Sequence, residues 1–323
     1  MSGQLAKPDS PRVSSLEEIL NADPNVIVLG TYQDEWLEQE FEKRVRRMPI
    51  AEHAMVDIAV GAAANGLRPI VEIGMASFLY VAMDAIVNQA AKLRYISNGQ
   101  FACPLVIRAS TFGGSSFFGP QHECVPYSQF MAVPGIEVLV ASDAVEGHQL
   151  LKRAIASPNP TLLFEYVGMW YSPALAGPEL DVTLGDVGSR VIRKGDDVTI
   201  VGIGRSLRAA MDAASQLAAL GIEAEVISQF SLSPLELSVV RESARKNGRL
   251  VIVEEGPPVC SAATEIEVSV SKWARAQQLV VDIQKLTAAP TPIAAAPVLQ
   301  TAIVPASSDV VMACQQLGCV PDQ

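Results

Sequence analysis

One carboxylate in this chain stands where a loop meets an apolar helix. Glu52 ends the stretch MPIAE, and residues 54–66 after it are nearly all Ala, Val, Ile and Gly. A helix that is apolar over most of its surface is expected to be buried. Burial disfavours the charged form of a carboxyl group, so Glu52 is suited to exchanging a proton with a ligand. The plainer alternative, favoured on this stretch alone, is a carboxylate that caps the helix.

A second candidate site is the glycine-rich loop TFGGSSFFGPQHEC, residues 111–124, which follows an apolar strand. In open α/β sheets, ligands bind at the carboxyl ends of strands, where this loop must lie. Its His122 can act as acid or base near neutral pH, although a solvated loop histidine is equally compatible with the spacing. Phe78 follows another strand and belongs at the same edge, as a ligand platform or as core. His53 could point toward Glu52 or away from it, and His148 is expected at the surface.

The elements that must position these side chains alternate regularly along the chain. Short β-branched runs are followed by longer helical stretches, a pattern typical of mostly parallel sheets with helices on both faces. The expected strands are 25–30, 68–74, 104–110, 137–142, 161–166, 197–204, 223–230, 249–256 and 280–288. The expected helices are one from residue 50, then 77–98, 143–156, 206–220, 234–246, 262–276 and 307–317.

This alternation predicts an α/β fold of two doubly wound domains. We expect a flexible tail at 1–14, a first domain at 15–175, a linker at 176–189 and a second domain at 190–323. The linker is indicated by a polar stretch rich in glycine and proline. The Ala- and Pro-rich segment 287–297 is expected to be irregular and at the surface.

The composition excludes several classes of function. The 323 residues are 49 % hydrophobic and 18 % charged, as in a globular protein of two domains. A net charge of −11 argues against nucleic acid or an anionic membrane as partner. No window approaches the ~20 apolar residues of a membrane span, and no signal segment opens the chain, so we expect a cytoplasmic protein. The five cysteines lack CxxC spacing and are expected to be reduced thiols.

Two phosphate-binding patterns are incomplete. VGIGRS at 201–206 lacks the third glycine of a dinucleotide fingerprint. A Gly-Asp-Gly followed downstream by Asn, which would hold Mg²⁺ and a diphosphate, is missing; KGDD at 194–197 and LGD at 184–186 do not fit. If the chain handles a diphosphate cofactor, something else must hold its metal end.

Five segments together resemble one family: PIAE (49–52), VDIAVGAAANGLRPIVEI (56–73), AMDAIVNQAAKLRYISNGQ (82–100), GPQH (119–122) and PGIEVLVASDA (134–144). The chain resembles the beta subunit of the thiamine-diphosphate-dependent decarboxylase component of 2-oxoacid dehydrogenases, pyruvate and acetoin type, in the transketolase-like superfamily. The resemblance extends over residues 24–320. It implies a pyrimidine-binding domain followed by a transketolase C-terminal-like domain.

The resemblance also implies roles for single residues. Glu52 matches the glutamate that hydrogen-bonds a pyrimidine nitrogen of thiamine diphosphate and so promotes proton loss from the thiazolium carbon. Phe78 matches the ring packed against the aminopyrimidine, and His122 matches the histidine near the substrate carbonyl. An alpha subunit would bring the motif for Mg²⁺ and the diphosphate, in an α2β2 heterotetramer. The resemblance further allows for a potassium ion at backbone carbonyls near 156–160, and for a lipoyl acyltransferase as partner.

Departures from the family keep two alternatives open. Ser228 and Phe230 stand where the family usually carries an acid and an arginine, and 288–292 lacks the customary aspartate. These changes make a transketolase-like or acyloin-forming carboligase a plausible alternative to the decarboxylase that passes on an acyl unit. A catalytically silent partner subunit is a third possibility, against which the presence of Glu52, Phe78 and His122 together counts.

Overall fold

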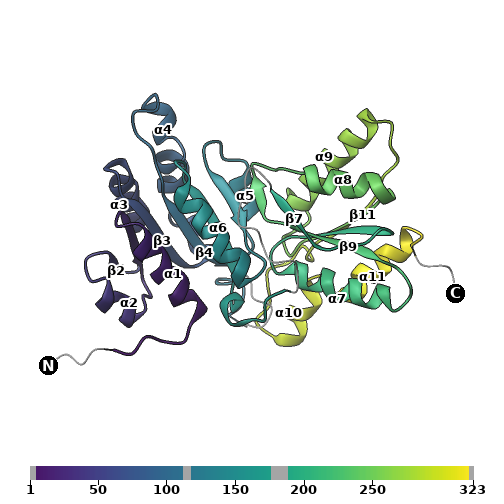
Figure 1. The fold of residues 1–323 in the computed structure, drawn as a ribbon, viewed down its shortest axis with the longest axis horizontal. Coiled ribbons are helices and arrows are strands. Elements are labelled where there is room, and N and C mark those ends of the chain that lie inside the picture. The colour runs from purple at the N-terminus through teal and green to yellow at the C-terminus, as the bar shows by residue number, and fades with distance from the viewer. Residues whose placement is uncertain (1–4, 112–117, 176–187, 320–323) are drawn as a thin grey trace.

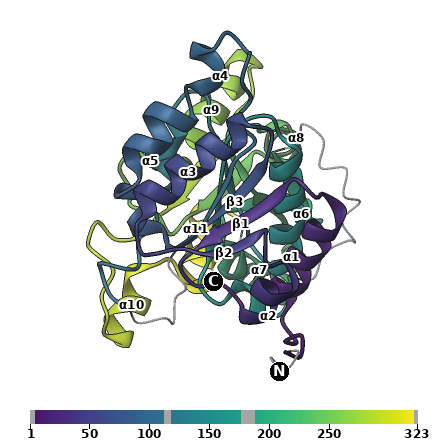
Figure 2. The same ribbon diagram turned by 90° about the vertical axis from the view of Figure 1, so that its left-hand side faces the viewer.

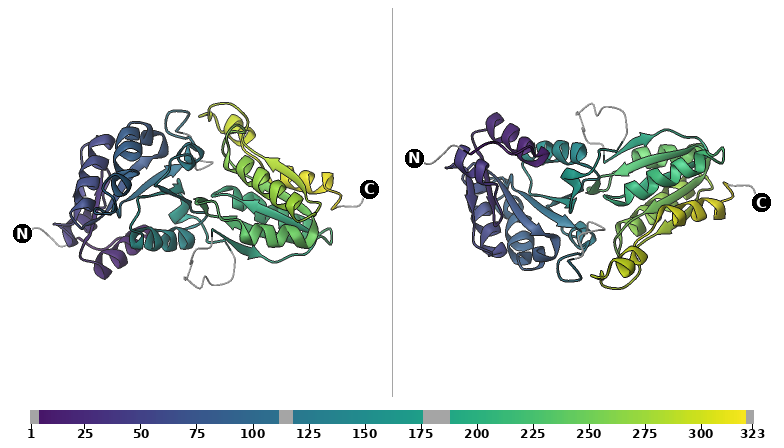
Figure 3. Two further views of the ribbon diagram at one scale, coloured as in Figure 1. Left: turned by 90° about the horizontal axis from the view of Figure 1, so that it is seen from above. Right: turned by 90° about the horizontal axis from the view of Figure 1, so that it is seen from below.

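Two β-sheets, each lying between layers of helices, sit side by side along the long axis of the molecule (Figure 1). The computed structural model describes residues 5–111, 118–175 and 188–319. Seen from above and below, the N-terminal and C-terminal halves occupy opposite ends (Figure 3). The expected fold class, two doubly wound α/β domains, is confirmed.

The first sheet has seven strands in the order β10-β5-β6-β4-β3-β1-β2. All neighbouring strands run parallel except β10, which is antiparallel to β5. The apolar residues of these strands face helices on both sides, which explains why the strands read as nearly continuous hydrophobic runs. The strands are β1 (Val26–Gly30), β2 (Val45–Arg47), β3 (Arg68–Met75), β4 (Val106–Thr111), β5 (Glu137–Val140), β6 (Thr161–Tyr166) and β10 (Ser231–Ser233).

Helices cover both faces of this sheet, as Figure 2 shows from its edge. One face carries α1 (Pro11–Ala22), α2 (Glu35–Glu40) and α6 (Ala144–Ala156). The other carries α3 (Glu52–Ala64), η1 (Ala76–Tyr80), η2 (Ala85–Ala90), α4 (Leu93–Ile96) and α5 (Tyr127–Met131). The continuous helix expected over 77–98 is therefore wrong: η1 is a 3₁₀ turn and η2 a π-helical turn. Hydrophobic spacing over such short runs does not distinguish these helix types.

The second sheet has the order β12-β11-β8-β9-β7, with only β7 antiparallel to its neighbour. Helices α7 (Ser206–Ala218) and α11 (Ser307–Gln316) cover one face, and α8 (Ser238–Asn247) and α9 (Ala262–Ala276) cover the other. The strands are β7 (Ser189–Arg193), β8 (Val198–Gly202), β9 (Ala224–Gln229), β11 (Arg249–Val253) and β12 (Asp282–Leu286).

The ends of the expected domains differ in part from the sequence reading. Helix α1 begins at Pro11, inside the segment 1–14 expected to be a flexible tail, with proline in its first turn where it favours a helix. The expected linker 176–189 lies almost wholly outside the described residues. The short η3 (Met169–Tyr171) precedes it and β7 follows it. The division of the chain at these positions stays a prediction.

The C-terminal segment is less superficial than expected. Residues 287–296 are irregular, but Ala288 and Ile293 are buried. They pack against Ile303 of the same domain and against Val125 of the first domain. Helix α10 (Pro297–Ile303) follows. Among the described residues, Pro297–Gln316 is the one stretch with the length and mean hydropathy (1.2) of a membrane span. This stretch is not one continuous helix: it is interrupted between α10 and α11, so neither helix alone reaches the ~20 residues that a span needs.

The two domains share a core and a sheet. One apolar cluster contains Val71 and Ile107 of the first sheet together with Ile252 of the second. Strand β10 leaves the second domain and pairs with β5, as Ser231 opposite Leu139 shows. The two domains are therefore held by main-chain hydrogen bonds as well as by apolar packing.

Ser228 and Phe230, two departures from the family pattern, lie at this junction inside the chain. The Ser228 hydroxyl donates to Glu146 at 3.0 Å and contacts Ser142 at 3.1 Å. Glu146 also accepts a hydrogen bond from Arg190 at 2.8 Å. Phe230 is completely buried in the core beneath α1 and α6. Within the described chain, these residues thus join the two domains to each other.

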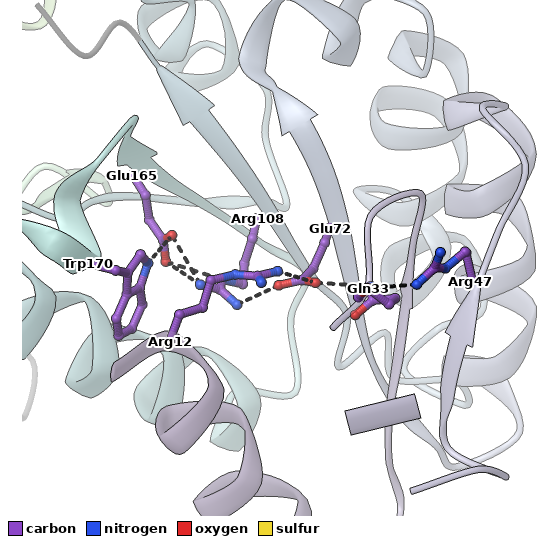
Figure 4. A network of polar contacts seen from close by, with 7 residues as sticks. All are labelled: Arg12, Gln33, Arg47, Glu72, Arg108, Glu165 and Trp170. Carbon is purple, nitrogen blue, oxygen red and sulfur yellow. Dashed lines mark hydrogen bonds and ion pairs between the residues drawn. The ribbon is translucent and has the colours of Figure 1, made fainter. Parts of the chain in front are cut away.

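A buried ion network crosses three neighbouring strands of the first sheet (Figure 4). Arg108 on β4 binds Glu72 on β3 at 2.7 Å and holds both oxygens of Glu165 on β6, at 2.9 and 3.0 Å. Arg12 of α1 binds Glu72 at 2.6 Å, and the Trp170 indole donates to Glu165 at 2.8 Å. Burial alone would raise the pKa of Glu72, but the attraction of Arg12 and Arg108 outweighs it and the pKa lies below its usual value.

We expect Arg108→Met to lower the free energy of unfolding by roughly 3–5 kcal/mol, because it removes the ion pair of buried Glu165 and leaves Glu72 with Arg12 alone. Urea unfolding at pH 7 measures this change. The matched control is Arg193→Met, which removes the more exposed pair of Arg193 and Glu223 at 3.1 Å and should cost less than about 1 kcal/mol. Equal effects of the two substitutions would contradict the network's role.

Two further carboxyl groups at the domain junction favour their protonated form. Glu254 and Glu255 follow β11, and burial raises the pKa of each to about 7. Glu254 accepts a hydrogen bond from the Ala263 amide at 2.6 Å and interacts with Tyr127 of the first domain. Glu255 forms an ion pair with Arg205 at 2.7 Å. Deprotonating these groups places buried negative charge between the domains, which Arg205 offsets only in part.

The free energy of unfolding should therefore fall as the pH rises from 5 to 8. Each carboxyl binds its proton more tightly in the folded chain, with a pKa of about 7, than in the unfolded chain at 4.5. This contribution is complete below pH 4.5 and is lost as the pH passes 7, on the order of 3 kcal/mol per group. Urea unfolding of Glu254→Gln should show a shallower pH dependence than wild type. The exposed control Glu223→Gln should not, and the same slope in all three proteins would refute the assignment.

Candidate active site

The three residues singled out from the sequence all lie beyond the carboxyl ends of parallel strands. Glu52 is the first residue of α3, which follows β2. Phe78 lies in η1 directly after β3, and His122 lies after β4. This edge of the sheet is where open α/β folds bind ligands. The topology thus brings Glu52, Phe78 and His122 to one side of the first domain.

Phe78 and His122 are in direct contact. Their ring centroids are 5.5 Å apart and their planes meet at 79°, an edge-to-face arrangement. Phe118, which the sequence reasoning did not single out, adds a second ring 6.3 Å from His122. His122 is half-buried, so it is held in place and still reachable. The only sequence signal for Phe118 is its place in the same loop.

Glu52 is a buried acid that stands apart from the aromatic pair. It is 9 % exposed, and among the described residues none donates a hydrogen bond to its carboxylate. No hydrogen bond or ion pair in that part of the chain joins it to Phe78 or His122. The capping alternative is therefore not supported by any side-chain hydrogen bond at this helix end. Its carboxylate remains available to a ligand.

The helix that begins at Glu52 is only half buried, contrary to expectation. Met55, Val56 and Ala59 pack into the shared core. Ala54 and Ile58 on the opposite side are exposed, Ile58 by 50 %. Helix α3 is therefore apolar on two faces, of which this chain buries one and leaves the other exposed.

The other two histidines lie away from this pair of rings. His53 is exposed and pairs with Asp57 one turn along α3, with Nε2 3.1 Å from Oδ2, so it faces outward rather than into the core. His148, expected at the surface, is half-buried on the opposite face of the sheet. Its Nδ1 lies 2.7 Å from the Ser15 hydroxyl, and burial lowers its pKa against the opposing effect of Glu18.

A cavity of about 190 Å³ lies beside the turn that carries His122. Pro120, Glu123 and Cys124 line it from the first domain, and Glu255 and Ile293 line it from the second. The turn is therefore built against the second domain and not against solvent alone. The sequence contained no signal for this contact, because its two sides are far apart in the chain.

Comparison with known proteins matches both domains and most of the chain. The family described as "Transketolase, pyrimidine binding domain" matches residues 14–169, and "Transketolase, C-terminal domain" matches residues 188–310. The pyruvate dehydrogenase E1 component subunit beta of Rhizobium meliloti is 37 % identical over 271 residues, 80 % of this chain and 58 % of that protein. The chain thus spans little more than half of that relative.

Two relatives match over more of their own length. The beta subunit of acetoin:2,6-dichlorophenolindophenol oxidoreductase from Cupriavidus necator is 32 % identical over 94 % of both chains. Its counterpart from Bacillus subtilis is 35 % identical over 85 % of this chain and 80 % of that one.

Solved structures share the fold at lower identity. A split-gene transketolase, described as an inactive beta4 tetramer, superposes with a TM-score of 0.77 at 23 % identity, covering 95 % of this chain and 97 % of that one. A transketolase variant from Pichia stipitis superposes with a TM-score of 0.70 at 19 % identity, covering 96 % of this chain but 46 % of that one. With its two transketolase-type domains and these relatives, the chain belongs to the family of E1-type beta subunits of the pyruvate and acetoin dehydrogenases, which depend on thiamine diphosphate.

Proposed function

We propose that the chain is the beta subunit of a heteromeric enzyme that decarboxylates a pyruvate-like 2-oxo acid with thiamine diphosphate and transfers the resulting acyl unit. The three relatives described above, 32–37 % identical, are named as beta subunits of a pyruvate dehydrogenase E1 component or of an acetoin oxidoreductase. The observation that carries the proposal is Glu52, a buried acid without a hydrogen-bond partner among the described residues. It opens a helix at the edge where Phe78 and His122 meet.

The residues present fit the aminopyrimidine half of thiamine diphosphate. A buried carboxylate that lacks a donor can accept a hydrogen bond from a ring nitrogen of a ligand and stays costly without one. Phe78 is half-buried and offers an apolar ring for packing against a flat heterocycle. Glu52 and Phe78 would thus hold the pyrimidine ring.

Thiamine diphosphate, when bound, supplies the carbon nucleophile and the electron sink for decarboxylation. Glu52 would exchange a proton at the pyrimidine ring nitrogen from its place as the first residue of α3. His122 would donate or accept a proton at the substrate oxygen, with its ring orientation set by the edge contact to Phe78.

A partner chain would complete the site. The Pichia stipitis transketolase has more than half of its length outside the part that this chain matches. We infer that a separate alpha subunit supplies the corresponding half, with the Mg²⁺ and diphosphate motif that the sequence lacks. The apolar outer face of α3, with Ala54 and Ile58, is an uncovered surface suited to burial in such an assembly.

Several finer points remain predictions. They are an α2β2 stoichiometry, a potassium ion near 156–160, a lipoyl acyltransferase as acyl acceptor and cytoplasmic residence. The carboligase alternative draws on transketolases that are 19–23 % identical and share the fold alone. The dehydrogenase-type relatives are closer in sequence, so acyl transfer is the favoured activity.

Glu52→Gln should reduce turnover of the assembled enzyme by about 10²–10⁴-fold, because an amide of the same shape cannot exchange the proton. The measurement is decarboxylation of pyruvate by the complex, with circular dichroism as a check on folding. Glu223→Gln, on the exposed surface of the second domain, is the matched control and should stay within a few-fold of wild type. Activity of Glu52→Gln in that same range would exclude the catalytic role and favour a silent partner subunit.

The isolated chain should bind thiamine diphosphate and Mg²⁺ weakly, because it holds only the pyrimidine side of the cofactor. Titration calorimetry should show strong binding once a co-expressed chain with the Gly-Asp-Gly…Asn motif is present. Ile58→Glu should prevent co-purification of that chain, since it puts a charge on the apolar face of α3. Val280→Glu, at a more exposed apolar position in the second domain, should not. Tight binding by the chain alone would contradict a divided site.

A further inference from the structure

The turn that carries His122 is closed by its own hydrogen bonds. The amides of His122 and Glu123 both donate to the Gly119 carbonyl, at 3.2 and 3.0 Å. The Gly119 amide in turn donates to the Glu123 carboxylate at 3.1 Å. Gly119 has φ +79°, a left-handed conformation that favours glycine. His122 thus lies in a compact turn, residues 119–123, that the side chain of Glu123 helps to close.

The second domain reaches into this turn through Gln300. The Gln300 amide on α10 donates to the Glu123 carboxylate at 2.8 Å. Gln300 is 0 % and Glu123 is 1 % exposed, so water does not substitute easily for either partner. Gly119 also lies against Ala295, since a Cβ added to it would come within 3.2 Å of the Ala295 Cβ. Two contacts from one segment therefore meet the turn.

Among the described residues, the Glu123 carboxylate accepts hydrogen bonds from two donors, the Gly119 amide and the Gln300 side-chain amide. Both bind the same oxygen, Oε2, whereas Oε1 of Glu123 is buried without a hydrogen-bond partner there. A buried carboxylate with so few donors depends strongly on each one. Loss of Gln300 would leave Glu123 held only by its own turn, which could then shift.

We propose that Glu123 and Gln300 are positioning residues, through which the second domain holds the turn of His122 against Phe78. The consequence for turnover rests on the proposed function of His122, but the positioning itself concerns this chain alone. A displacement of about 1 Å can cost on the order of 10²-fold in rate. The second domain would then contribute to catalysis without touching the substrate.

An exchange of the two side chains tests the proposal. Gln300→Glu places two carboxylates against each other and should release the turn. Adding Glu123→Gln removes this repulsion. The new amide can accept from Gly119 through an oxygen at the Oε2 position and donate, from a nitrogen at the otherwise unpartnered Oε1 position, to the carboxylate introduced at position 300. Gln216→Leu, which removes a distant hydrogen bond between α7 and Ser307 at 3.0 Å, is the matched control. Circular dichroism establishes that each variant folds.

The first readout is the NMR spectrum of the full chain with ¹³C-labelled histidine. The chain has three histidines, and loss of one signal in His122→Gln assigns the residue of interest. The ring of Phe78 at 5.5 Å makes the His122 signal sensitive to its position. Gln300→Glu should shift this signal while those of His53 and His148 stay in place. The double variant should return it to the wild-type position.

The second readout is turnover of the assembled enzyme. We expect kcat to fall roughly 10- to 100-fold in Gln300→Glu, with KM within about threefold, and to recover in the double variant. An unmoved His122 signal in Gln300→Glu, or a double variant shifted further than the single one, would overturn the positioning proposal. A shifted and rescued signal with unchanged kcat would support the positioning and would instead count against the catalytic role of His122.

Discussion

The Arg108 guanidinium is the interaction on which the rest of the first domain depends. It binds Glu72 on β3 and Glu165 on β6 from its place on β4, so one buried cation fixes three neighbouring strands. Phe78 follows β3 and His122 follows β4. A buried ion pair is weak evidence for stability, but it restricts which arrangements of strands are possible. The strands that carry Phe78 and His122 toward each other are thus also joined by the ion pairs of Arg108.

The apolar residues of α3 exceed what this chain alone buries. Its apolar residues predict a helix buried on all sides, yet Ile58 and Ala54 are exposed here. The helix is also the one that begins with Glu52, so the uncovered face and the unpartnered acid lie on a single element. A chain that covered this face would also come close to Glu52. The hydrophobic pattern and the incomplete site thus indicate the same missing neighbour.

Sequence reasoning located the strands and the amphipathic helices well, because β-branched runs and helical spacing are local signals. α6, α7 and α9 end within about two residues of the expected positions. It missed three short strands, β2, β7 and β10, which carry no clear strand pattern, and the helices α1, α2, α5 and α10. It also missed the broken helix after Phe78. The charges within RPIVEIG, PLVIRAS and TLLFEY were visible in the sequence, but their pairing depends on strand order. Likewise, the residue types left the roles of Glu52, Phe78 and His122 open and the family resemblance assigned them, whereas the contact of Phe78 with His122 depends on loop geometry.

The departures in the second domain have a structural explanation that bears on the choice of reaction. Ser228 binds Glu146 across the junction and Phe230 fills the core of the first domain. Gln300 joins the same two domains beside His122. All three residues make contacts that hold the two domains of this chain together. Two of the changes that made a carboligase plausible, at Ser228 and Phe230, are thus explained by packing inside the chain and do not by themselves favour carboligation over acyl transfer.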